Sequence, residues 1–463
     1  MKRIMSRSYL VLIVALAFFG GICFLAFRVV TQNTDWIQQP YNGHMAATDG
    51  LSGAGTIYDR NGVILAYNDA NDKRCYHDDQ LTRESLLHVV GDNSLNISTA
   101  VQSMFRTDLT GYNFILGLGL PHSLKTNRDV QLTVDSDACR AAYEALGYHR
   151  GACVVYNYKT GEVLCSTSRN SYDPADPPEI TEENEHEDQY EGVYLDNAVS
   201  SSFTPGSTFK IITSTSAIEN IPDIYQQTFT CTGEYEVLGS KITCEYAHGT
   251  MTFEEAFAHS CNCAYARIAI QLGDEKLKAT AEELGFNHKG FTMSGIPLAE
   301  SHYDATDAGD NYLAWSGIGQ YHDLANPMHM AMVCSAVANG GTAASPFIIQ
   351  DDGTLLNKLG IDVNKAGDVS MIDPSVAVKV QDLMRGAANY YYNGSGVNMA
   401  GLNFCAKTGT AEVGEGKQPT AWFVGYCEDE QHPYAFAAVV VEGGYGIGAA
   451  YQVANAAVTA LVY

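Results

Sequence analysis

A serine and a lysine lie three residues apart in FTPGSTFK, residues 203–210, directly after a proline and a glycine. Proline and glycine do not suit a helix interior, whereas apolar residues recur at helical spacing over 211–218, so a helix is expected to begin near Ser207. Residues three apart share one helix face, which brings the Lys210 amine over the Ser207 hydroxyl at the positive end of the helix dipole. A neutral amine within reach can take the serine proton, so this pair can form an activated nucleophile.

An isolated Ser-x-x-Lys also arises by chance, as an N-cap serine followed by a solvated lysine. Two further motifs give it meaning: Ser-Cys-Asn at 260–262, at the start of another helical run, and Lys-Thr-Gly-Thr at 407–410, in a strand candidate. In this order, with gaps of 53 and 147 residues from position 207 to 260 and on to 407, the three resemble the motif set of the penicillin-recognising serine acyltransferases.

The resemblance extends over nearly all of the chain beyond its first apolar run, and it is to the class B penicillin-binding proteins. These are anchored, monofunctional peptidoglycan DD-transpeptidases. The chain departs from the family at two places, since Ala54 and Ala198 stand where an arginine is usual. The segments that carry the resemblance are YDRNGVILA (58–66), QLTVDSDACRAAYEAL (131–146), TGEVLCSTSRNSYDP (160–174), FTPGSTFKI (203–211), HGTMTFEEAFAHSCN (248–262), GIGQ (317–320), NPMHMA (326–331), KTGTAE (407–412) and AWFVGY (421–426).

The resemblance and the chemistry of acyl transfer together assign roles. Lysine normally titrates near ~10.4, so Lys210 needs burial or a neighbouring cation to act as the base for Ser207, and Lys407 is the expected cation. Ser260 and Asn262 are expected to relay the proton to the leaving D-alanine amine and to hold the substrate amide.

The remaining groups of the expected site contact the substrate ends. Lys407 is expected to attract the terminal carboxylate, and the hydroxyls of Thr408 and Thr410 to bind it. The backbone N–H groups of Ser207 and Thr410 are expected to form an oxyanion hole. Glycine at Gly409, as at position 206, allows the acyl group to approach closely, because a side chain there would crowd it.

The resemblance implies the reaction: a stem peptide ending in D-Ala-D-Ala acylates Ser207, D-alanine leaves, and the amine of a neighbouring stem peptide resolves the ester into a cross-link. β-Lactams are the expected inhibitors, and a SEDS-family membrane glycan polymerase is the expected partner. No cofactor and no metal site are expected, since the 13 histidines include no His-Glu-x-x-His. Two alternatives stay open: a penicillin sensor or idle scaffold on the same fold, and a β-lactamase or DD-carboxypeptidase, although no Glu-x-x-Leu-Asn follows the Ser-x-Asn motif.

The amino-terminal residues indicate a membrane anchor. Three basic residues precede residues 9–27, which carry no charge, and 19 apolar or neutral residues suffice to cross a bilayer. The expected topology has a cytoplasmic tail at 1–8, an anchor at 9–30 and the rest of the chain outside the cell; a cleaved signal peptide is the alternative. A net charge of -26 argues against nucleic acid or an anionic membrane surface as a partner.

The pattern along the chain predicts an α+β fold. Strand-like runs follow a helical run near 135–146 and return near the carboxyl end, with mostly helical sequence over 200–340 between them. We therefore expect an antiparallel sheet with flanking helices and an inserted helical subdomain, over 128–463. A small pedestal domain is expected over 31–127.

Two features have no assigned role. Residues 173–196 carry ten acidic residues and three prolines, which favours a solvated insertion over a calcium-binding or substrate-facing loop. Twelve cysteines make disulfides possible in an exported chain. Cys153 and Cys165 could face each other across a hairpin, while Cys231 and Cys244 flank a short segment with two glycines; either pair can equally be reduced.

Overall fold

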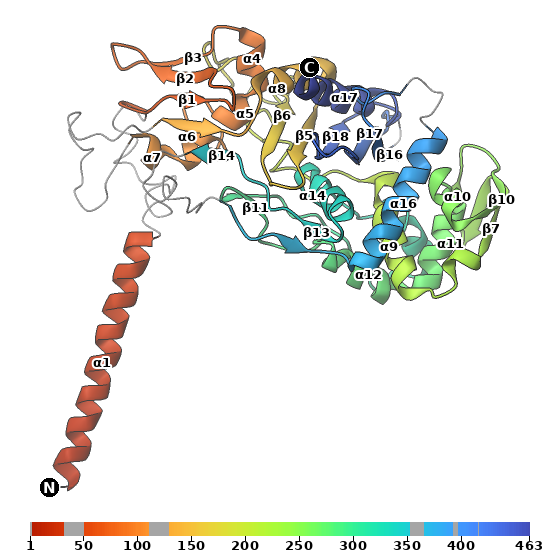
Figure 1. Cartoon of the computed structure of the whole chain (residues 1–463), viewed down its shortest axis with the longest axis horizontal. Helices are drawn as coiled ribbons and strands as arrows, with labels where there is room; N and C mark the ends of the chain where they lie inside the picture. The colour runs from red at the N-terminus through yellow and green to blue at the C-terminus, as the bar shows by residue number, and fades with distance from the viewer. Residues whose placement is uncertain (1, 32–50, 111–128, 352–364, 392–396, 415) are drawn as a thin grey trace.

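A five-stranded antiparallel sheet, in the order β16-β17-β18-β5-β6, forms the centre of the larger part of the molecule (Figure 1). The structure is a computed structural model that describes residues 2–31, 51–110, 129–351, 365–391, 397–414 and 416–463. The sheet confirms the expected plan, because its strands come from two distant segments of the chain. They are β5 (Gly151–Asn157), β6 (Val163–Arg169), β16 (Phe404–Ala411), β17 (Thr420–Cys427) and β18 (Tyr434–Val440).

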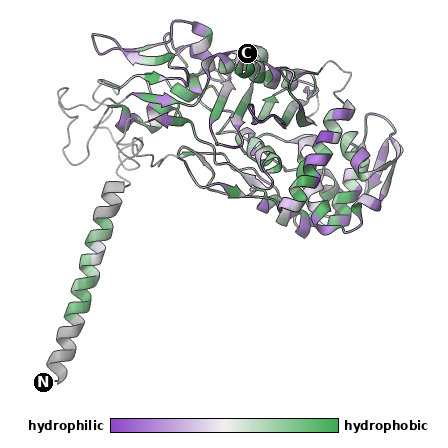
Figure 2. Ribbon diagram, viewed as in Figure 1, coloured by the Kyte–Doolittle hydropathy of each residue, from purple (hydrophilic) through white to green (hydrophobic). Residues whose placement is uncertain are grey.

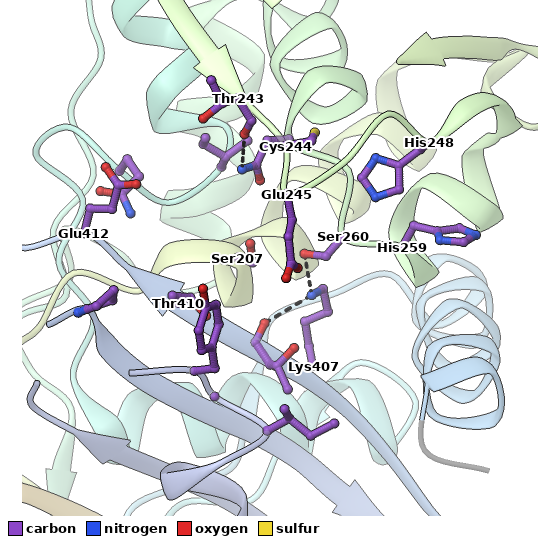
Figure 3. A pocket seen from close by; sticks show the side chains of 18 of the residues that line it. Ser207, Thr243, Cys244, Glu245, His248, His259, Ser260, Lys407, Thr410 and Glu412 are labelled. Atoms are coloured by element: carbon purple, nitrogen blue, oxygen red, sulfur yellow. Dashed lines mark hydrogen bonds between the residues drawn. The ribbon is translucent and has the colours of Figure 1, made fainter. Parts of the chain in front are cut away.

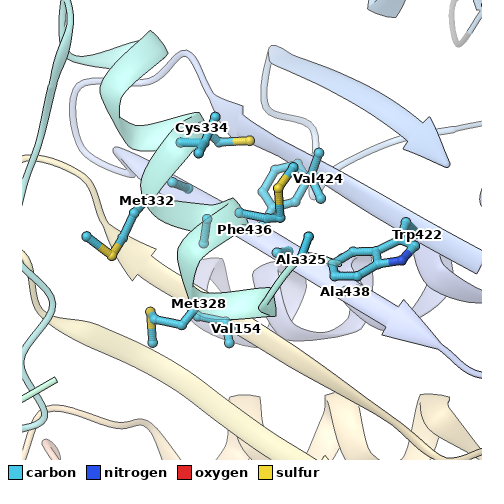
Figure 4. Close-up of a cluster of buried hydrophobic side chains, with 14 of the residues drawn as sticks. Val154, Ala325, Met328, Met332, Cys334, Trp422, Val424, Phe436 and Ala438 are labelled. Atoms are coloured by element: carbon cyan, nitrogen blue, oxygen red, sulfur yellow. The ribbon is translucent and has the colours of Figure 1, made fainter. Parts of the chain in front are cut away.

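Helices cover both faces of this sheet. All eight residues of β17 are buried, which is why the strand reads as a continuous apolar run and not as an alternation. Figure 4 shows buried apolar side chains of one covering helix, Met328 among them, beside Val154 and Phe436 of the strands, and Figure 2 shows the hydropathy of each residue in this layer. The covering helices are α14 (Pro327–Ala338) on one side and α8 (Ser136–Leu146) with α17 (Ala449–Val462) on the other.

A second five-stranded sheet takes three of its strands from the amino-terminal part of the chain and has the order β14-β4-β1-β2-β3. Two of its strands, β4 and β14, come from the segment expected to form the catalytic domain. Their pairing with the amino-terminal strands was not predicted, because strands that are far apart in the sequence leave no local signal of their pairing. Residues 32–50 and 111–128 of the expected pedestal lie outside the described residues, and its boundaries stay a prediction. The strands are β1 (Ile57–Tyr58), β2 (Ile64–Asn68), β3 (Arg74–Tyr76), β4 (Val130–Leu132) and β14 (Ile349–Asp351).

The predicted helical insertion packs beside the β16 edge of the central sheet (Figure 1). A capping box between Thr252 and Glu255 starts one of its helices, as the two side chains satisfy each other's backbone N–H groups. Two small strand pairs, β7 with β10 and β8 with β9, complete it. Its elements are α9 (Lys210–Asn220), β7 (Thr228–Cys231), β8 (Glu234–Val237), β9 (Ser240–Thr243), β10 (Gly249–Thr252), α10 (Phe253–Ala258), α11 (Asn262–Leu272), α12 (Asp274–Glu283), α13 (Asp310–Ser316) and α16 (Pro374–Tyr391).

The amino-terminal residues form the helix α1 (Lys2–Thr31). Among the residues that the structure describes, no helix combines the length and the apolar character needed to cross a membrane. The anchor expected over residues 9–30 stays a prediction.

The acidic segment 173–196 is mostly exposed, as a solvated insertion should be. Its first residue is held by a two-point ion pair, since Arg83 Nε and Nη2 lie 2.7 and 2.6 Å from the Asp173 carboxylate oxygens. Within the described part of the chain, no group of side chains in this segment is arranged to bind a metal ion.

All twelve cysteines are free thiols. A bulge in the β5–β6 hairpin shifts its register, so that Cys153 pairs with Thr167 and Cys165 pairs with Val155. The possibility that Cys153 and Cys165 pair directly across the hairpin is therefore not realised. They are diagonal neighbours on one face of the sheet.

Candidate active site

Ser207 lies in a tight turn that leads into α9. The turn is the 3₁₀ helix η2 (Gly206–Phe209), and the α-helix itself begins at Lys210. The backbone of Gly206 donates to the Gly319 carbonyl at 2.9 Å, and the Phe209 ring stacks on Tyr303 with ring centroids 5.3 Å apart. These contacts fix the turn from both ends and place Ser207 at the expected helix start.

Two glycines let this turn lie directly against strand β16. Gly206 has φ +53, and a Cβ built there lies 2.6 Å from the Thr410 carbonyl oxygen. A Cβ on Gly409 lies 2.7 Å from the Pro205 carbonyl oxygen. Glycine at these positions thus admits the neighbouring backbone; the room it was expected to leave for the acyl group stays a prediction.

Replacing Gly206 with alanine should therefore strain the site. The side chain meets both a left-handed φ and the Thr410 carbonyl, so we expect a loss of about 3 kcal/mol, seen as a lower Tm. Gly147→Ala is the matched control, because Gly147 has φ +61 but nothing lies within 4 Å of the added Cβ. Equal drops in Tm for the two variants would show that the contact between turn and strand is not tight.

The Lys210 amine makes four close polar contacts in the site. Its Nζ lies 3.1 Å from Ser207 Oγ, 3.1 Å from Ser260 Oγ, 2.6 Å from the Ser260 carbonyl oxygen and 2.7 Å from Asn262 Oδ1. The side chain is fully buried, and burial lowers the pKa of Lys210 to about 8. A lysine with this pKa is partly neutral near physiological pH.

The Ser-x-Asn motif is held in an unusual backbone conformation. Ser260 has φ +52 and lies two residues before Asn262, where α11 begins. Asn262 Nδ2 donates to the Thr243 carbonyl at 2.9 Å, so the same amide that contacts Lys210 is tied to the end of β9 (Figure 3). Serine in the left-handed region costs energy, which the surrounding contacts must offset.

Lys407 approaches from the strand on the other side. Its Nζ donates to Ser260 Oγ at 2.9 Å and to the Thr408 carbonyl at 3.1 Å (Figure 3). Burial, with the charge of Lys210 as a further cause, holds the pKa of Lys407 well below its usual range. Of the two causes expected for a lowered Lys210 pKa, burial or a neighbouring cation, burial is the main one.

These groups line one cleft of about 450 Å³. Seven of the eight predicted residues contribute: Ser207, Ser260, Asn262, Lys407, Thr408 and Thr410 line it, while Lys210 lies buried beneath and contacts three of them. The eighth, Gly409, packs against the nucleophile turn. The structure thus brings all the predicted site residues together.

Other lining residues were not predicted from the sequence. Trp315 and Tyr445 lie outside the segments quoted for the resemblance, and Gln320 belongs to the quoted GIGQ but was given no role in the site. Glu245 comes from the loop after β9, and Figure 3 shows its side chain extending into the cleft. Only the tertiary fold brings these segments to the same cleft.

The arrangement can activate a serine hydroxyl and stabilise an anion. A buried amine of lowered pKa contacts the hydroxyl, and a second lysine shares the Ser260 hydroxyl with it. The cleft is open enough for a peptide, with a strand edge along one wall.

Comparison with known proteins agrees with this geometry. A family model for the penicillin binding protein transpeptidase domain matches residues 151–459. The peptidoglycan D,D-transpeptidase PbpA of Mycolicibacterium smegmatis is 28% identical over 348 residues, which cover 68% of this chain and 68% of that protein.

Solved structures show the same fold. The D,D-transpeptidase domain of a peptidoglycan glycosyltransferase from Eggerthella lenta is 26% identical with a TM-score of 0.72, covering 89% of this chain and 99% of that one. Penicillin-binding protein A of Mycobacterium tuberculosis, as a penicillin G acyl-enzyme complex, is 23% identical with a TM-score of 0.72, covering 89% of this chain and 100% of that one. The chain belongs to the family of the penicillin-binding protein transpeptidase domain.

Proposed function

We propose that this protein is a peptidoglycan DD-transpeptidase that works through an acyl-enzyme on Ser207. The observation that carries the proposal is the position of Lys210 Nζ, 3.1 Å from the Ser207 hydroxyl and held by Ser260 and Asn262. Family membership and the D,D-transpeptidase name of the related PbpA support the same reaction. No cofactor takes part in it.

In the acylation step, neutral Lys210 takes the proton of Ser207 Oγ as the oxygen attacks the carbonyl of the penultimate D-alanine. The C–N bond to the terminal D-alanine then breaks. Ser260 Oγ, which contacts both Lys210 and Lys407, passes a proton to the leaving amine. The backbone N–H groups of Ser207 and Thr410 then stabilise the oxyanion; the close approach of the Thr410 backbone to the turn at Gly206 supports this role.

The terminal carboxylate of the donor peptide binds at Lys407, with the hydroxyls of Thr408 and Thr410 as further partners. Before binding, burial and the nearby Lys210 disfavour the protonated form of Lys407. A carboxylate restores that charge, because an opposite charge raises a lysine pKa. The site therefore selects peptides that end in a free carboxylate.

The rate of acylation should rise with pH through the pKa of Lys210. The base is the unprotonated amine, and its pKa of about 8 leaves roughly a tenth of it neutral at pH 7. We expect the second-order rate constant for fluorescent penicillin labelling to increase about tenfold from pH 6 to 7 and to level off above pH 8. Stopped-flow labelling across this range measures it, and a flat profile would exclude Lys210 as the titrating base.

A cross-linking assay distinguishes a transpeptidase from a carboxypeptidase and from a sensor or scaffold. The purified chain is given a donor peptide ending in D-Ala-D-Ala and an acceptor with a free side-chain amine, and mass spectrometry follows D-alanine and the cross-linked product. We expect the two to form together. D-alanine release without cross-linking would mean a carboxypeptidase, and neither product would mean a sensor or scaffold.

We further infer that residues 9–27 anchor the chain and place the cleft outside the cell. The uncharged stretch of 19 residues behind three basic ones supports this topology. Deletion of residues 1–30 should release the protein from sedimenting membranes; a deleted chain that still sediments would argue against the anchor. The SEDS-family polymerase stays a predicted partner, to be tested by co-purification from membranes.

A further inference from the structure

Four metal-binding side chains converge beside the cleft. The ligand atoms of Cys231, Cys244, His248 and Cys261 all lie within 4.8 Å of one another. The residues come from four places: the end of β7, the residue after β9, the residue before β10, and the residue before α11. No metal site was expected from the sequence, although the spacing Cys-x12-Cys-x3-His-x12-Cys places three cysteines and one histidine within a short segment.

The separations suit one tetrahedral ion. Zinc binds sulfur at about 2.3 Å and imidazole nitrogen at about 2.0 Å, so tetrahedral ligands lie about 3.8 Å apart for two sulfurs and about 3.5 Å for sulfur and nitrogen. Cys244 Sγ lies 3.8 Å from Cys261 Sγ, and Cys231 Sγ lies 3.4 Å from His248 Nδ1. Both separations match this geometry.

The surroundings of the three sulfurs suit thiolates. Each accepts a backbone N–H at 3.4 Å: Gly233 donates to Cys231, Cys263 to Cys244, and Ala264 to Cys261. Donors of this kind orient metal-bound thiolates and stabilise their charge. Cys231 and Cys261 are buried and the other two ligands are half-buried, so a bound ion is shielded on most sides.

We propose that Cys231, Cys244, His248 and Cys261 bind one zinc ion as a closed structural site. Three thiols release their protons to solvent on binding, and the imidazole binds as the neutral base. Three thiolates and one imidazole favour zinc over magnesium or calcium, which prefer oxygen ligands. A disulfide accounts for the cluster less well, because it joins two sulfurs and leaves the third and the imidazole unused.

The zinc site lies next to the catalytic groups of the proposed function. Cys261 stands between Ser260 and Asn262, and Cys244 follows Thr243, whose carbonyl accepts the Asn262 amide at 2.9 Å. One ion thus binds the middle residue of the Ser-x-Asn motif and the residue that follows the Asn262 partner Thr243. It therefore helps to fix Ser260 at φ +52. The four ligands are positioning residues, and this effect on acylation rests on the proposed function; the presence of the ion does not.

Metal analysis of the full-length protein tests the site. The protein is purified in detergent without a polyhistidine tag or chelator, and zinc is measured by mass spectrometry of the elements. We expect about one zinc per chain in the wild type, and loss of it in Cys231→Ser and His248→Ala. Replacing zinc with cobalt(II) should give thiolate-to-metal charge-transfer absorption in the wild type.

Three comparisons sharpen the test. Cys75→Ser, a half-buried cysteine on β3, should keep both zinc and penicillin labelling. Ser207→Ala should lose labelling but keep zinc, which separates the site from the proposed function. Removing zinc from the wild type should slow labelling about 10²-fold, and adding it back should restore the rate.

Clear results would overturn the proposal. Wild-type protein with less than about a tenth of a zinc ion per chain would exclude it, as would a disulfide mapped between any two of the three cysteines. Zinc retained by both ligand variants would exclude this ligand set. So would loss of zinc in Cys263→Ser, whose sulfur lies 3.5 Å from Cys244 Sγ but is not among the four ligands.

Discussion

Replacing Ser207 with alanine should abolish both cross-linking and penicillin labelling. Without the hydroxyl no ester forms, and removing the nucleophile of a serine acyltransferase lowers kcat by about 10⁶-fold. The fold should survive, because Ser207 is half-buried at the cleft and alanine suits the helical turn. Fluorescent penicillin labelling followed by electrophoresis measures the loss.

Ser201→Ala provides the control for this variant. Ser201 lies six residues ahead of Ser207 and its hydroxyl contacts Asn197 Oδ1 at 3.0 Å, away from the residues that line the cleft. It should label at the wild-type rate. Labelling that persists in Ser207→Ala would place the nucleophile elsewhere and end the site assignment.

The second large effect is expected for Lys210→Arg. A guanidinium keeps its proton at any pH the protein tolerates, so it cannot take the proton of Ser207 Oγ. Loss of general-base catalysis should slow acylation by about 10²–10⁴-fold and remove the rise in rate up to pH 8. Rate constants measured from pH 6 to 9 in both proteins test this.

A structural explanation of the Lys210→Arg result has to be separated from the chemical one. The buried position holds four close contacts to Nζ, and a larger head group can disturb them. Lys210→Met gives the second comparison, since it also lacks a base but has no charge to bury. Both variants should be slow; acylation at the wild-type rate in either would make Lys210 a structural residue only.

Much of the fold is visible in local sequence patterns. The runs that became β5, β6, β16, β17 and β18 are rich in β-strand formers and are bounded by turn residues, so the strands and their antiparallel sheet were predicted, whereas their order in the sheet was not. The start of the helix near Ser207 was likewise signalled by a proline and a glycine. The three motifs predicted the catalytic groups only in combination, because each alone is common and their order and spacing together resemble the family's motif set.

Long-range pairing was less predictable. The strands β4 and β14 joined the amino-terminal sheet, although the sequence placed both with the catalytic domain. The bulge that separates Cys153 from Cys165 depends on one extra residue in a strand, which periodicity does not reveal. The Cys231 cluster was missed because its cysteines were considered in pairs, while the fold gathers four ligands from four segments.

The lifetime of the penicillin adduct tests the central claim most directly. Hydrolysis of the acyl-enzyme needs a base that activates water. The partners of Lys210 Nζ are Ser207, Ser260 and Asn262, and the Glu245 carboxylate, although it lines the cleft, is not among them. Intact-mass spectrometry of the full chain with benzylpenicillin, followed by peptide mapping, should show one adduct on Ser207 that persists for hours, against a median enzyme turnover of ~10 per second. An adduct on another residue, or hydrolysis of many penicillin molecules per second, would contradict the account.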